Sequence, residues 1–312
     1  MSVRPARVRV EARAKLNLGL AVGPRRADGF HDLATVFQSI SLADTLTVER
    51  RTRGFSLAIR YEDASVRRAG LRGRGRIPAG RDNLVLRAAR LVAARYRLTG
   101  GAHFHLVKRI PAGAGLGGGS ADAAAAIAGL ARLHGLAIAP AERPAIGAAL
   151  GSDVPFALFG GTALGLGRGE RLRRLRLAAP FRALIALPPW RVSTAAAFRA
   201  MDRGKYGLTG WGSKLRIAQR IGREAITPNV VARLGNSFEG VPGKHRAEFL
   251  SLRDRLRVAG VEAPHLTGTG SAVFGVIRAG RPGQHVVERF AGSETVFLVR
   301  SRGRGLTIIT LP

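Results

Sequence analysis

The sequence predicts a mixed fold of strands and helices, built as about two domains. Hydrophobic residues alternate with other residues at 103–107, as they do in a half-buried strand. Residues 122–133 are rich in Ala and Leu, which favour helix. The chain has 312 residues, and 46% of them are hydrophobic. That length is typical of about two domains, and that composition is sufficient for a full core.

Valines alternate with arginines at the start of the chain, at Val8 and Val10, which predicts an opening strand. Lys15 and Asn17 follow on this strand. Because they are two residues apart, their side chains would lie on the same face. The residues alone leave two interpretations: solvated polar groups on an edge strand, or part of a site.

An Asp-Gly pair at 28–29 predicts a tight turn after the opening strand. Phe30 and His31 stand at the exit of this turn. In isolation, such a pair is more often simple packing than a site. A core strand is expected to return through residues 37–42, with Asp44 in the turn that follows.

Residues 67–81 are basic, glycine-rich and without periodicity, which predicts a loop. A helix is expected to follow and to run to about Tyr96. Asp82 or Asn83 stands at the position of its N-cap. Capping alone would account for Asn83.

The glycine-rich segment 111–119 links the strand at 103–107 to the helix at 122–133. Glycines let backbone N–H groups approach a ligand without Cβ clashes, and a helix N-terminus adds unpaired donors and partial positive charge. Ser120 stands where an N-cap or a phosphate-contacting hydroxyl would be. The segment therefore predicts an anion cradle, for phosphate. A flexible linker is the alternative, but a linker would lack the flanking strand and the helix.

Two common phosphate loops are excluded. A P-loop ends in Gly-Lys-Ser or Gly-Lys-Thr, whereas this segment ends in Gly119-Ser120-Ala121. A dinucleotide fingerprint requires an acidic residue at the end of the next strand, and none stands out.

A second helix is expected at 141–150, followed by the sequence Gly-Ser-Asp-Val-Pro. Pro155 is expected to hold Val154 in an extended conformation and thereby to fix the direction of Asp153. The residues alone leave Asp153 as either a structural turn residue or a functional carboxylate. A domain boundary is expected near Leu172.

The C-terminal half is expected to begin with a strand at 182–187 and a helix capped by Ser193 or Thr194. A further helix is predicted at 245–258 by the spacing of its apolar residues. Residues 266–274 predict a glycine-rich turn between two strands, for which a simple hairpin is the alternative. Strands at 295–299 and 306–311 are expected to close the sheet. Residues 205–226 are the least informative part of the chain.

The net charge of +31 admits three explanations: nucleic-acid binding, attraction of anionic substrates, or a compositional bias toward arginine. Arginines occur in all segments instead of forming one tail, which favours bias with a solvated basic surface. The chain has no cysteine and no apolar run of about 18 residues, so it predicts neither disulfides nor a membrane span. No signal core precedes the first strand, and a cytoplasmic protein is expected.

Several of these motifs together resemble the GHMP kinases. Residues 111–120 are similar to the phosphate loop of that superfamily, and residues 151–155 and 266–271 to two further motifs. Residues 12–18 are similar to its opening strand, with Arg13 in place of a proline. The triple glycine and the Asp-Gly-Phe-His sequence at 28–31 most resemble the branch that phosphorylates a cytidine diphosphate alcohol for non-mevalonate isoprenoid synthesis.

The resemblance implies an α+β, two-domain GHMP kinase fold with the site in the cleft between the domains. Residues 1–171 would form a ribosomal S5-like, ATP-binding domain, and residues 172–312 a ferredoxin-like, substrate-binding domain. It implies ATP as phosphoryl donor, Mg²⁺ held mainly by phosphates with no metal-ligating cluster of side chains, and a cytidine diphosphate alcohol as acceptor. Neither a membrane nor a dedicated nucleic-acid partner is expected, and the protein would be a monomer or a homodimer.

The resemblance also assigns roles to residues. Asp153 would be the catalytic base, with Lys15 beside the transferring phosphoryl group. Phe30 would stack on the cytosine, and His31 would contact the edge of the base. The ATP-binding residues would be Asn83, Lys108, Pro111, Gly113, Gly115, Leu116, Gly117, Gly118, Gly119 and Ser120. The acceptor-binding residues would be Asn17, Phe30, His31, Thr194, Phe198, Gly268, Thr269 and Gly270.

Two alternatives remain open from the sequence. One is another GHMP kinase, of the homoserine or mevalonate type. The other is a basic nucleic-acid-binding protein on an inactive kinase fold, against which the presence of both Lys15 and Asp153 argues.

Overall fold

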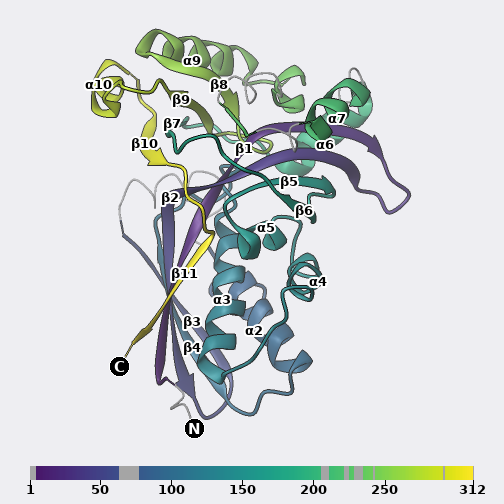
Figure 1. Ribbon diagram of the computed structural model, residues 1–312, viewed down its shortest axis with the longest axis vertical. Helices are drawn as coiled ribbons and strands as arrows, with labels where there is room; N and C mark the ends of the chain where they lie inside the picture. The colour runs from purple at the N-terminus through teal and green to yellow at the C-terminus, as the bar shows by residue number, and fades with distance from the viewer. Residues whose placement is uncertain are drawn as a thin grey trace.

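The computed structural model describes residues 5–62, 77–204, 211–220, 225–227, 235–241, 243–290 and 292–311. Within these residues the strands form two sheets, one of seven strands and one of four, which confirms the mixed fold (Figure 1). Most of the predicted loop at 67–81 and part of the segment 205–226 lie outside the described residues. Among the helices described, none has the length and hydrophobicity that a membrane crossing requires.

The first sheet is built on two long antiparallel strands, β1 and β2, which curve together into an arm at their upper end (Figure 1). The strand order is β11-β1-β2-β4-β3, and β5 pairs with both β2 and β6. Its strands are β1 (Arg7–Arg25), β2 (His31–Arg51), β3 (Phe55–Tyr61), β4 (Gly101–Lys108), β5 (Thr162–Gly167), β6 (Arg171–Arg174) and β11 (Leu306–Leu311).

Helices α2 (Leu84–Arg95) and α3 (Gly118–His134) pack together, and α3 lies against β1 and β2. Small residues let α3 approach the sheet closely, and Ala123 to Ala126 are completely buried. A Cβ on Gly129 would lie only 2.6 Å from Cγ2 of Val48. The short helices α4 (Arg143–Ala148) and α5 (Val154–Phe159) follow and bring the chain back to the sheet.

The second sheet has the antiparallel order β10-β7-β9-β8. Its strands and the helices α9 and α10 follow one another as strand, helix, strand, strand, helix, strand, which is the ferredoxin-like arrangement. These elements are β7 (Arg182–Leu187), α9 (Arg246–Ala259), β8 (Val261–Leu266), β9 (Val273–Ile277), α10 (Gly283–Arg289) and β10 (Thr295–Arg300). Between β7 and α9 lie α6 (Thr194–Gly204), α7 (Trp211–Arg220) and the 3₁₀ turn η2 (Ser237–Gly240).

Several local predictions are confirmed. The strand at 182–187 and the helix near 245–258 are present, the latter displaced by one residue. Asn83 caps α2, because its side-chain oxygen accepts a hydrogen bond from the backbone nitrogen of Val85 at 2.9 Å. Ser193 caps α6 in the same way, through the nitrogen of Ala196 at 3.4 Å.

Other local predictions were wrong. Helix α3 begins at Gly118 and not at residue 122, because Gly117 enters it in the left-handed conformation with φ of 71°; Ser120 therefore lies in the first turn and not at the cap. Val154 is the first residue of α5 and is not extended, since a proline is tolerated within the first turn of a helix. Asp44 lies inside β2 and not in a turn after it.

The chain returns to the first sheet at its end, which sequence order did not indicate. The strands predicted at 295–299 and 306–311 do not close one sheet: β10 pairs with β7 in the second sheet, and β11 pairs with β1 in the first. Strand β6 also spans the expected domain boundary at 171 and 172. The division into residues 1–171 and 172–312 therefore stays a prediction.

Candidate active site

The site is organised around an ion pair between Lys15 of β1 and Asp153, which immediately precedes α5. The Nζ atom of Lys15 lies 3.5 Å from Oδ2 of Asp153. Lys15 is only 6% exposed, whereas Asp153 is partly open to solvent. The pairing of β1 with β2 shifts register between Arg13 and Lys15, and such an irregularity changes the direction of the side chains that follow it. The two residues are therefore brought together, and their catalytic roles stay a prediction.

Lys15 and Asn17 share one face of the strand, as predicted. The Lys15 ammonium donates to Oδ1 of Asn17 at 2.5 Å, and Nδ2 of Asn17 donates to Oγ1 of Thr35 at 2.8 Å. Thr35 in turn donates to the carbonyl oxygen of Gly19 at 2.7 Å. This chain of bonds holds the Asn17 amide with its oxygen toward Lys15, so both polar groups have a defined direction in the site.

The glycine-rich loop between β4 and α3 packs directly against Lys15. The backbone nitrogen of Lys15 donates to the carbonyl oxygen of Leu116 at 3.0 Å. A Cβ on Gly117 would lie 3.0 Å from Cγ of Lys15, and Gly117 has a left-handed φ. The loop therefore needs glycine at this position both for its conformation and for its approach to the lysine.

The turn between β8 and β9 closes on the same loop from the other side. A Cβ on Gly115 would lie 2.1 Å from the carbonyl oxygen of Thr267. The Thr267 hydroxyl donates to the carbonyl oxygen of Gly115 at 3.2 Å and accepts from the backbone nitrogen of Asn17 at 3.1 Å. Asn236 supports the turn, because its Nδ2 donates to the carbonyl oxygens of Leu266 and Gly268. Elements from both sheets thus meet at one point.

A buried ion cluster lies beneath the glycine loop. The ammonium of Lys108, which is 1% exposed, contacts the carboxylates of Asp44 and Asp122. The other oxygen of Asp44 accepts from the backbone nitrogens of Arg109 and Ile110. The cluster joins β2, the end of β4 and the start of α3, so it anchors both ends of the loop.

Burial shifts the acid–base equilibria of this cluster. Burial is the largest influence on Asp122 and raises the pKa of its carboxyl group to about 8, against an ordinary value of 3.8. Burial would lower the pKa of the Lys108 ammonium, but the charges of Asp122 and Asp44 outweigh it and raise that pKa. Burial therefore favours the protonated form of Asp122, whereas the two neighbouring carboxyl groups favour the charged form of Lys108.

A pocket of about 420 Å³ opens on the glycine loop. Near the loop, Oδ1 of Asp122 is buried without a hydrogen-bond partner among the described residues. The pocket is lined by Ile77, Pro78, Asp82, Asn83, Leu84, Lys108, Pro111, Ala112, Gly113, Gly115, Leu116, Gly117, Gly118, Gly119, Ser120 and Asp122. Every residue that the sequence assigned to ATP is in this set.

A larger pocket of about 780 Å³ contains Lys15 and Asp153. It shares Gly115 and Ser120 with the first pocket, so the glycine loop is a common wall. Its lining also includes all the predicted acceptor-binding residues except Gly270, namely Asn17, Phe30, His31, Thr194, Phe198, Gly268 and Thr269. Gly270 lies buried within the β8–β9 turn, and its assignment to the acceptor has no support from the lining.

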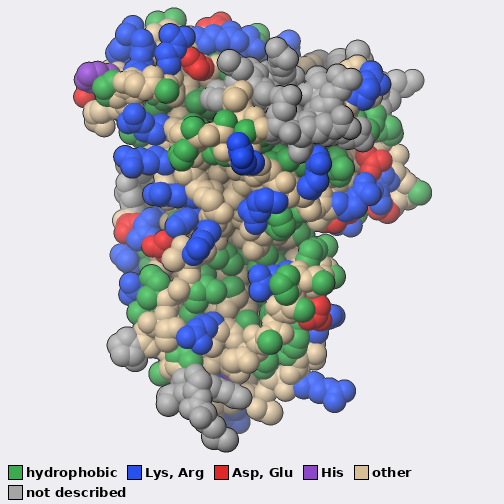
Figure 2. All heavy atoms as spheres, viewed as in Figure 1, with side chains coloured by type: hydrophobic (Ala, Val, Ile, Leu, Met, Phe, Trp, Pro, Cys, Tyr) green, Lys and Arg blue, Asp and Glu red, His purple; other side chains and the backbone are tan. Residues whose placement is uncertain are grey.

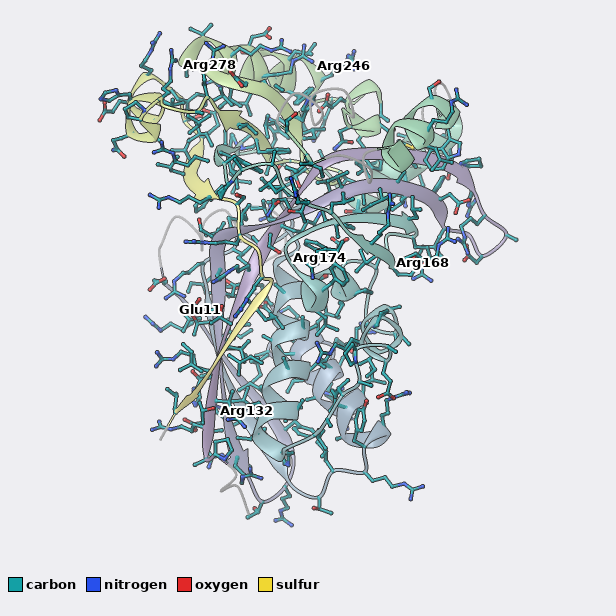
Figure 3. The ribbon with its side chains drawn as sticks, viewed as in Figure 1. Glu11, Arg132, Arg168, Arg174, Arg246 and Arg278 are labelled. Atoms are coloured by element: carbon teal, nitrogen blue, oxygen red, sulfur yellow. The ribbon has the colours of Figure 1, made fainter. Side chains whose placement is uncertain are left out.

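The far end of the larger pocket is aromatic. The Phe30 ring is 46% exposed, and the Arg168 guanidinium lies 3.8 Å from its centroid; Figure 3 labels Arg168 in the turn between β5 and β6, below the arm. The rings of His31 and Phe198 stack at 5.1 Å. Nε2 of His31 lies 2.8 Å from Oδ1 of Asp202 on α6. Aromatic side chains from β2, from the turn that precedes it and from α6 therefore line this end of the pocket.

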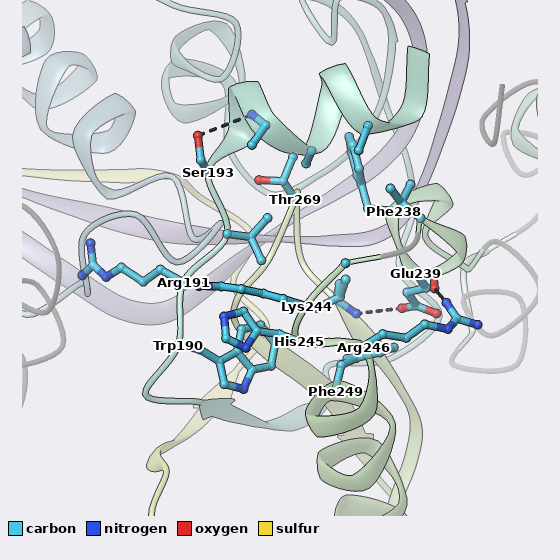
Figure 4. A pocket seen from close by; sticks show the side chains of 17 residues that line it. Trp190, Arg191, Ser193, Phe238, Glu239, Lys244, His245, Arg246, Phe249 and Thr269 are labelled. Atoms are coloured by element: carbon cyan, nitrogen blue, oxygen red, sulfur yellow. Dashed lines mark hydrogen bonds between the residues drawn. The ribbon is translucent and has the colours of Figure 1, made fainter. Parts of the chain in front are cut away.

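A third pocket, of about 420 Å³, adjoins the larger one and shares Phe238 and Thr269 with it (Figure 4). The rings of Trp190 and His245 stack at one side of it, with centroids 5.0 Å apart. The side chain of Arg191 leads away from this pocket (Figure 4) and reaches the glycine loop, where a Cβ on Gly113 would lie 3.1 Å from its Nη1. This pocket does not include the Lys15–Asp153 pair.

Basic side chains are spread over both parts of the molecule on the face shown in Figure 2, and they do not gather into a single patch there. Among the described residues, no group of three or more His, Asp or Glu side chains could hold a metal ion.

Sequence reasoning missed several residues that build the site. Thr267 lies within the glycine-rich turn predicted at 266–274, so proximity to that motif was an available signal. Asp44 and Asp122 carry no local signal of pairing with a lysine, because the three residues come from different elements. Asp202 looks like an ordinary polar residue of an amphipathic helix.

Known proteins share this architecture. The profile of the GHMP kinases N terminal domain matches residues 83–161. A crystal structure of homoserine kinase from Cytophaga hutchinsonii superposes with a TM-score of 0.72, covering 99% of both chains, and its 17% identity shows the fold alone. The two sheets, the glycine loop and the adjoining Lys–Asp pair thus define a kinase of the GHMP class.

Closer relatives narrow this class. The 4-diphosphocytidyl-2-C-methyl-D-erythritol kinase of Moorella thermoacetica is 39% identical over 280 residues, which is 89% of this chain and 93% of the relative. That of Pelotomaculum thermopropionicum is 38% identical over 289 residues, 92% of this chain and 95% of the relative. A crystal structure of 4-(cytidine 5'-diphospho)-2C-methyl-D-erythritol kinase superposes with a TM-score of 0.72 at 33% identity, covering 95% of this chain and 99% of that one. The chain belongs to the 4-diphosphocytidyl-2-C-methyl-D-erythritol kinase family.

Proposed function

We propose that this protein transfers the γ-phosphoryl group of ATP to the 2-hydroxyl of 4-diphosphocytidyl-2-C-methyl-D-erythritol, a step in non-mevalonate isoprenoid precursor synthesis. The proposal rests mainly on the position of one pair of residues. The Lys15–Asp153 pair lies in the pocket lined by the aromatic residues, next to the wall shared with the glycine-loop pocket. Two substrates bound in the two pockets would meet at this pair. The names of the relatives supply the acceptor.

In this proposal the pocket on the glycine loop takes ATP. The glycine loop offers backbone N–H groups to the phosphates, and the N-terminus of the 17-residue helix α3 adds partial positive charge. By resemblance to the family, Asn83 and Lys108 would lie near the adenine, although the Lys108 ammonium already contacts two carboxyl groups. Its contribution would therefore come largely through support of the loop.

The chemistry follows from the positions of the two central side chains. Asp153 accepts the proton of the acceptor hydroxyl, whose oxygen forms a bond to the γ-phosphorus while the bond to the ADP oxygen breaks. The ammonium of Lys15, 3.5 Å from that carboxylate, balances the negative charge of the transferring group. Asn17 holds the lysine in this direction.

Mg²⁺ would enter with ATP and be held mainly by phosphate oxygens. The hydroxyl of Ser120, on the wall that both pockets share, is the side-chain oxygen that we expect to contribute.

The larger pocket would take the acceptor. Phe30 and Phe198 would flank the cytosine and His31 would contact its edge, while Thr194 and the β8–β9 turn would face the diphosphate. The hydroxyls of Thr194 and Thr269 lie 3.1 Å apart, so the two elements already meet. We further propose that the pockets lie in a cleft between two domains divided near residue 171, that the protein acts in the cytoplasm, and that it is a monomer or a homodimer.

A panel of acceptors with labelled ATP tests the proposal. We expect turnover of the cytidine diphosphate alcohol, and none of homoserine or mevalonate. Turnover of one of those alcohols, with the cytidine compound inert, would replace this proposal by the corresponding GHMP kinase. Salt-dependent binding of DNA or RNA without any turnover would instead support the nucleic-acid alternative.

A further inference from the structure

The third pocket has no part in the proposed reaction, because neither Lys15 nor Asp153 lines it. Its volume of about 420 Å³ falls within the range of about 300–1,000 Å³ that is usual for small-molecule sites. Its lining includes the buried side chains of Ala197, Phe238, Phe249 and Leu266 and the half-buried Val192 and Val241 (Figure 4). This interior is suited to the apolar part of a ligand.

Helix α6 leaves room for the third pocket because it turns small side chains toward it. Ala196, Ala197 and Ala200 all line the pocket. Residues three and four apart lie on one face of a helix, so these alanines form a continuous wall. A larger side chain at Ala200 would occupy part of the space.

Another face of the same helix lines the larger pocket, through Thr194, Phe198 and Asp202. A single helix is therefore a wall of both pockets. Phe238 also lines both, and its ring meets that of Phe198 edge-on, with centroids 5.0 Å apart. A ligand that packs against this wall from one side would hold in place the side chains on the other.

The charged part of the lining is mainly basic. Lys244 and Arg246, just before and at the start of α9, are exposed and so lie at the solvent edge of the pocket. Glu239 is the one carboxylate that lines it among the described residues, and its Oε1 already accepts from the backbone nitrogen of Leu266 at 2.8 Å. Arg246 donates to the backbone carbonyl oxygen of Glu239 at 2.8 Å, a bond that leaves its charge uncompensated. An anionic group would therefore be attracted to this edge.

We propose that the third pocket is a regulatory site for an amphipathic anion. The apolar chain of this ligand fills the space beside α6, and its phosphate head contacts Lys244 and Arg246. By packing against α6 and Phe238, the bound ligand stabilises the arrangement that lines the larger pocket and so raises the affinity for the acceptor. The binding itself is independent of the proposed function, and only the effect on the acceptor rests on it.

The first experiment is calorimetric titration of the full chain with alkyl phosphates from butyl to decyl, below their micelle concentrations. ADP is present throughout, so that the glycine-loop pocket is not open to the phosphate head. We expect the affinity to rise about 4-fold per added methylene until the pocket is full. Inorganic phosphate, which lacks the chain, and octanol, which lacks the charge, should bind far more weakly than octyl phosphate. Equal binding of octanol and octyl phosphate would overturn the role of the basic edge.

Two variants place the ligand. Ala200→Leu fills the pocket and should weaken octyl phosphate by about 10-fold or more, since little space remains for the chain. Lys244→Gln, on an exposed side chain, should weaken octyl phosphate but not octanol. Ala247→Leu is the matched control for Ala200→Leu, because Ala247 is exposed on α9 next to Arg246 and does not line the pocket. If octyl phosphate does not bind, or binds Ala200→Leu and the unaltered protein equally, the inference is wrong.

The second experiment measures the acceptor KM with and without saturating octyl phosphate. We expect the ligand to lower this KM by about 5-fold in the unaltered protein and to have no effect in Ala200→Leu. The acceptor should tighten octyl phosphate binding by the same factor, because such coupling is reciprocal. An unchanged or raised KM would overturn the coupling. If the cytidine acceptor is not turned over at all, the proposed function fails, and calorimetry still decides whether the pocket binds the anion.

Discussion

Lys15 and Asp153 form an ion pair of 3.5 Å that joins the first strand of the chain to the start of a short helix far along it. Neither side chain is held by this pair alone. Lys15 is also bonded to Asn17, and Pro155 in the first turn of α5 limits the backbone beside Asp153. The pair is thus presented by two rigid elements at the boundary of two pockets.

Asp153→Asn should lower turnover by about 10²-fold to 10⁴-fold, because the amide cannot accept the proton of the acceptor hydroxyl. ATP affinity should stay nearly unchanged, since Asp153 does not line the glycine-loop pocket. Steady-state kinetics and calorimetric titration with ATP measure the two effects. Asp254→Asn, on an exposed carboxylate of α9, is the control. Near-normal turnover in Asp153→Asn would remove this residue from the role of base.

Two glycines of the same loop should respond differently to alanine. In Gly115→Ala the new Cβ would meet the Thr267 carbonyl oxygen at 2.1 Å, in a backbone with φ of 81°. The clashing atom belongs to the backbone and cannot move away as a flexible side chain could. We therefore expect a loss of about 1–3 kcal/mol in the free energy of unfolding. Thermal or denaturant unfolding measures it.

Gly119→Ala is the contrasting variant. Its Cβ would have only Leu84 nearby, at 3.4 Å, and it lies in the first turn of α3, where alanine is favoured over glycine by about 1 kcal/mol. Stability should be retained while ATP affinity falls, because the methyl group would intrude on the phosphates. Unimpaired ATP binding in this variant would mean that the phosphates lie elsewhere.

Phe30→Ala should raise the KM for the acceptor and leave kcat much less affected. Stacking of a base on an aromatic ring contributes about 1–3 kcal/mol. Phe159→Ala is a close control, because Phe159 also carries an arginine on its ring, Arg174 at 4.0 Å, but does not line the acceptor pocket. An unchanged acceptor KM in Phe30→Ala would contradict the stacking role.

The buried carboxyl group of Asp122 predicts a pH dependence of stability. Burial raises its pKa to about 8, so between about pH 4 and pH 8 the folded protein holds a proton that the unfolded chain releases. The resulting stabilisation is complete below the ordinary value of 3.8 and is lost as the pH rises through about 8.

Asp122→Asn cannot titrate, so this contribution should be missing from its stability. The difference in the free energy of unfolding between the unaltered protein and the variant should change by up to about 1.4 kcal/mol per pH unit within the window. At low pH this difference in the free energy of unfolding should favour the unaltered protein. Urea unfolding from pH 5 to pH 9 measures this difference, with Asp254→Asn as the control. Parallel curves for the unaltered protein and Asp122→Asn would contradict a raised pKa.

Features that depend on residues close together in the sequence were predictable from it. The strand, glycine loop and helix around residue 115 follow from alternation, glycine content and helix propensity. The cap by Asn83 follows from the chemistry of one side chain. The boundary of α3 was misplaced, because the left-handed conformation of Gly117 starts the helix earlier than its apolar residues indicate.

The sequence by itself determined the local elements, the shared face of Lys15 and Asn17, and the kinship of the glycine motifs. Tertiary structure alone decided that β11 joins β1, that Lys108 is buried between Asp44 and Asp122, and that Asp202 bonds to His31. The physical reason is the range of the interactions. Propensity, periodicity and capping act over a few residues, whereas these pairings arise when separate elements pack and bury their polar groups together.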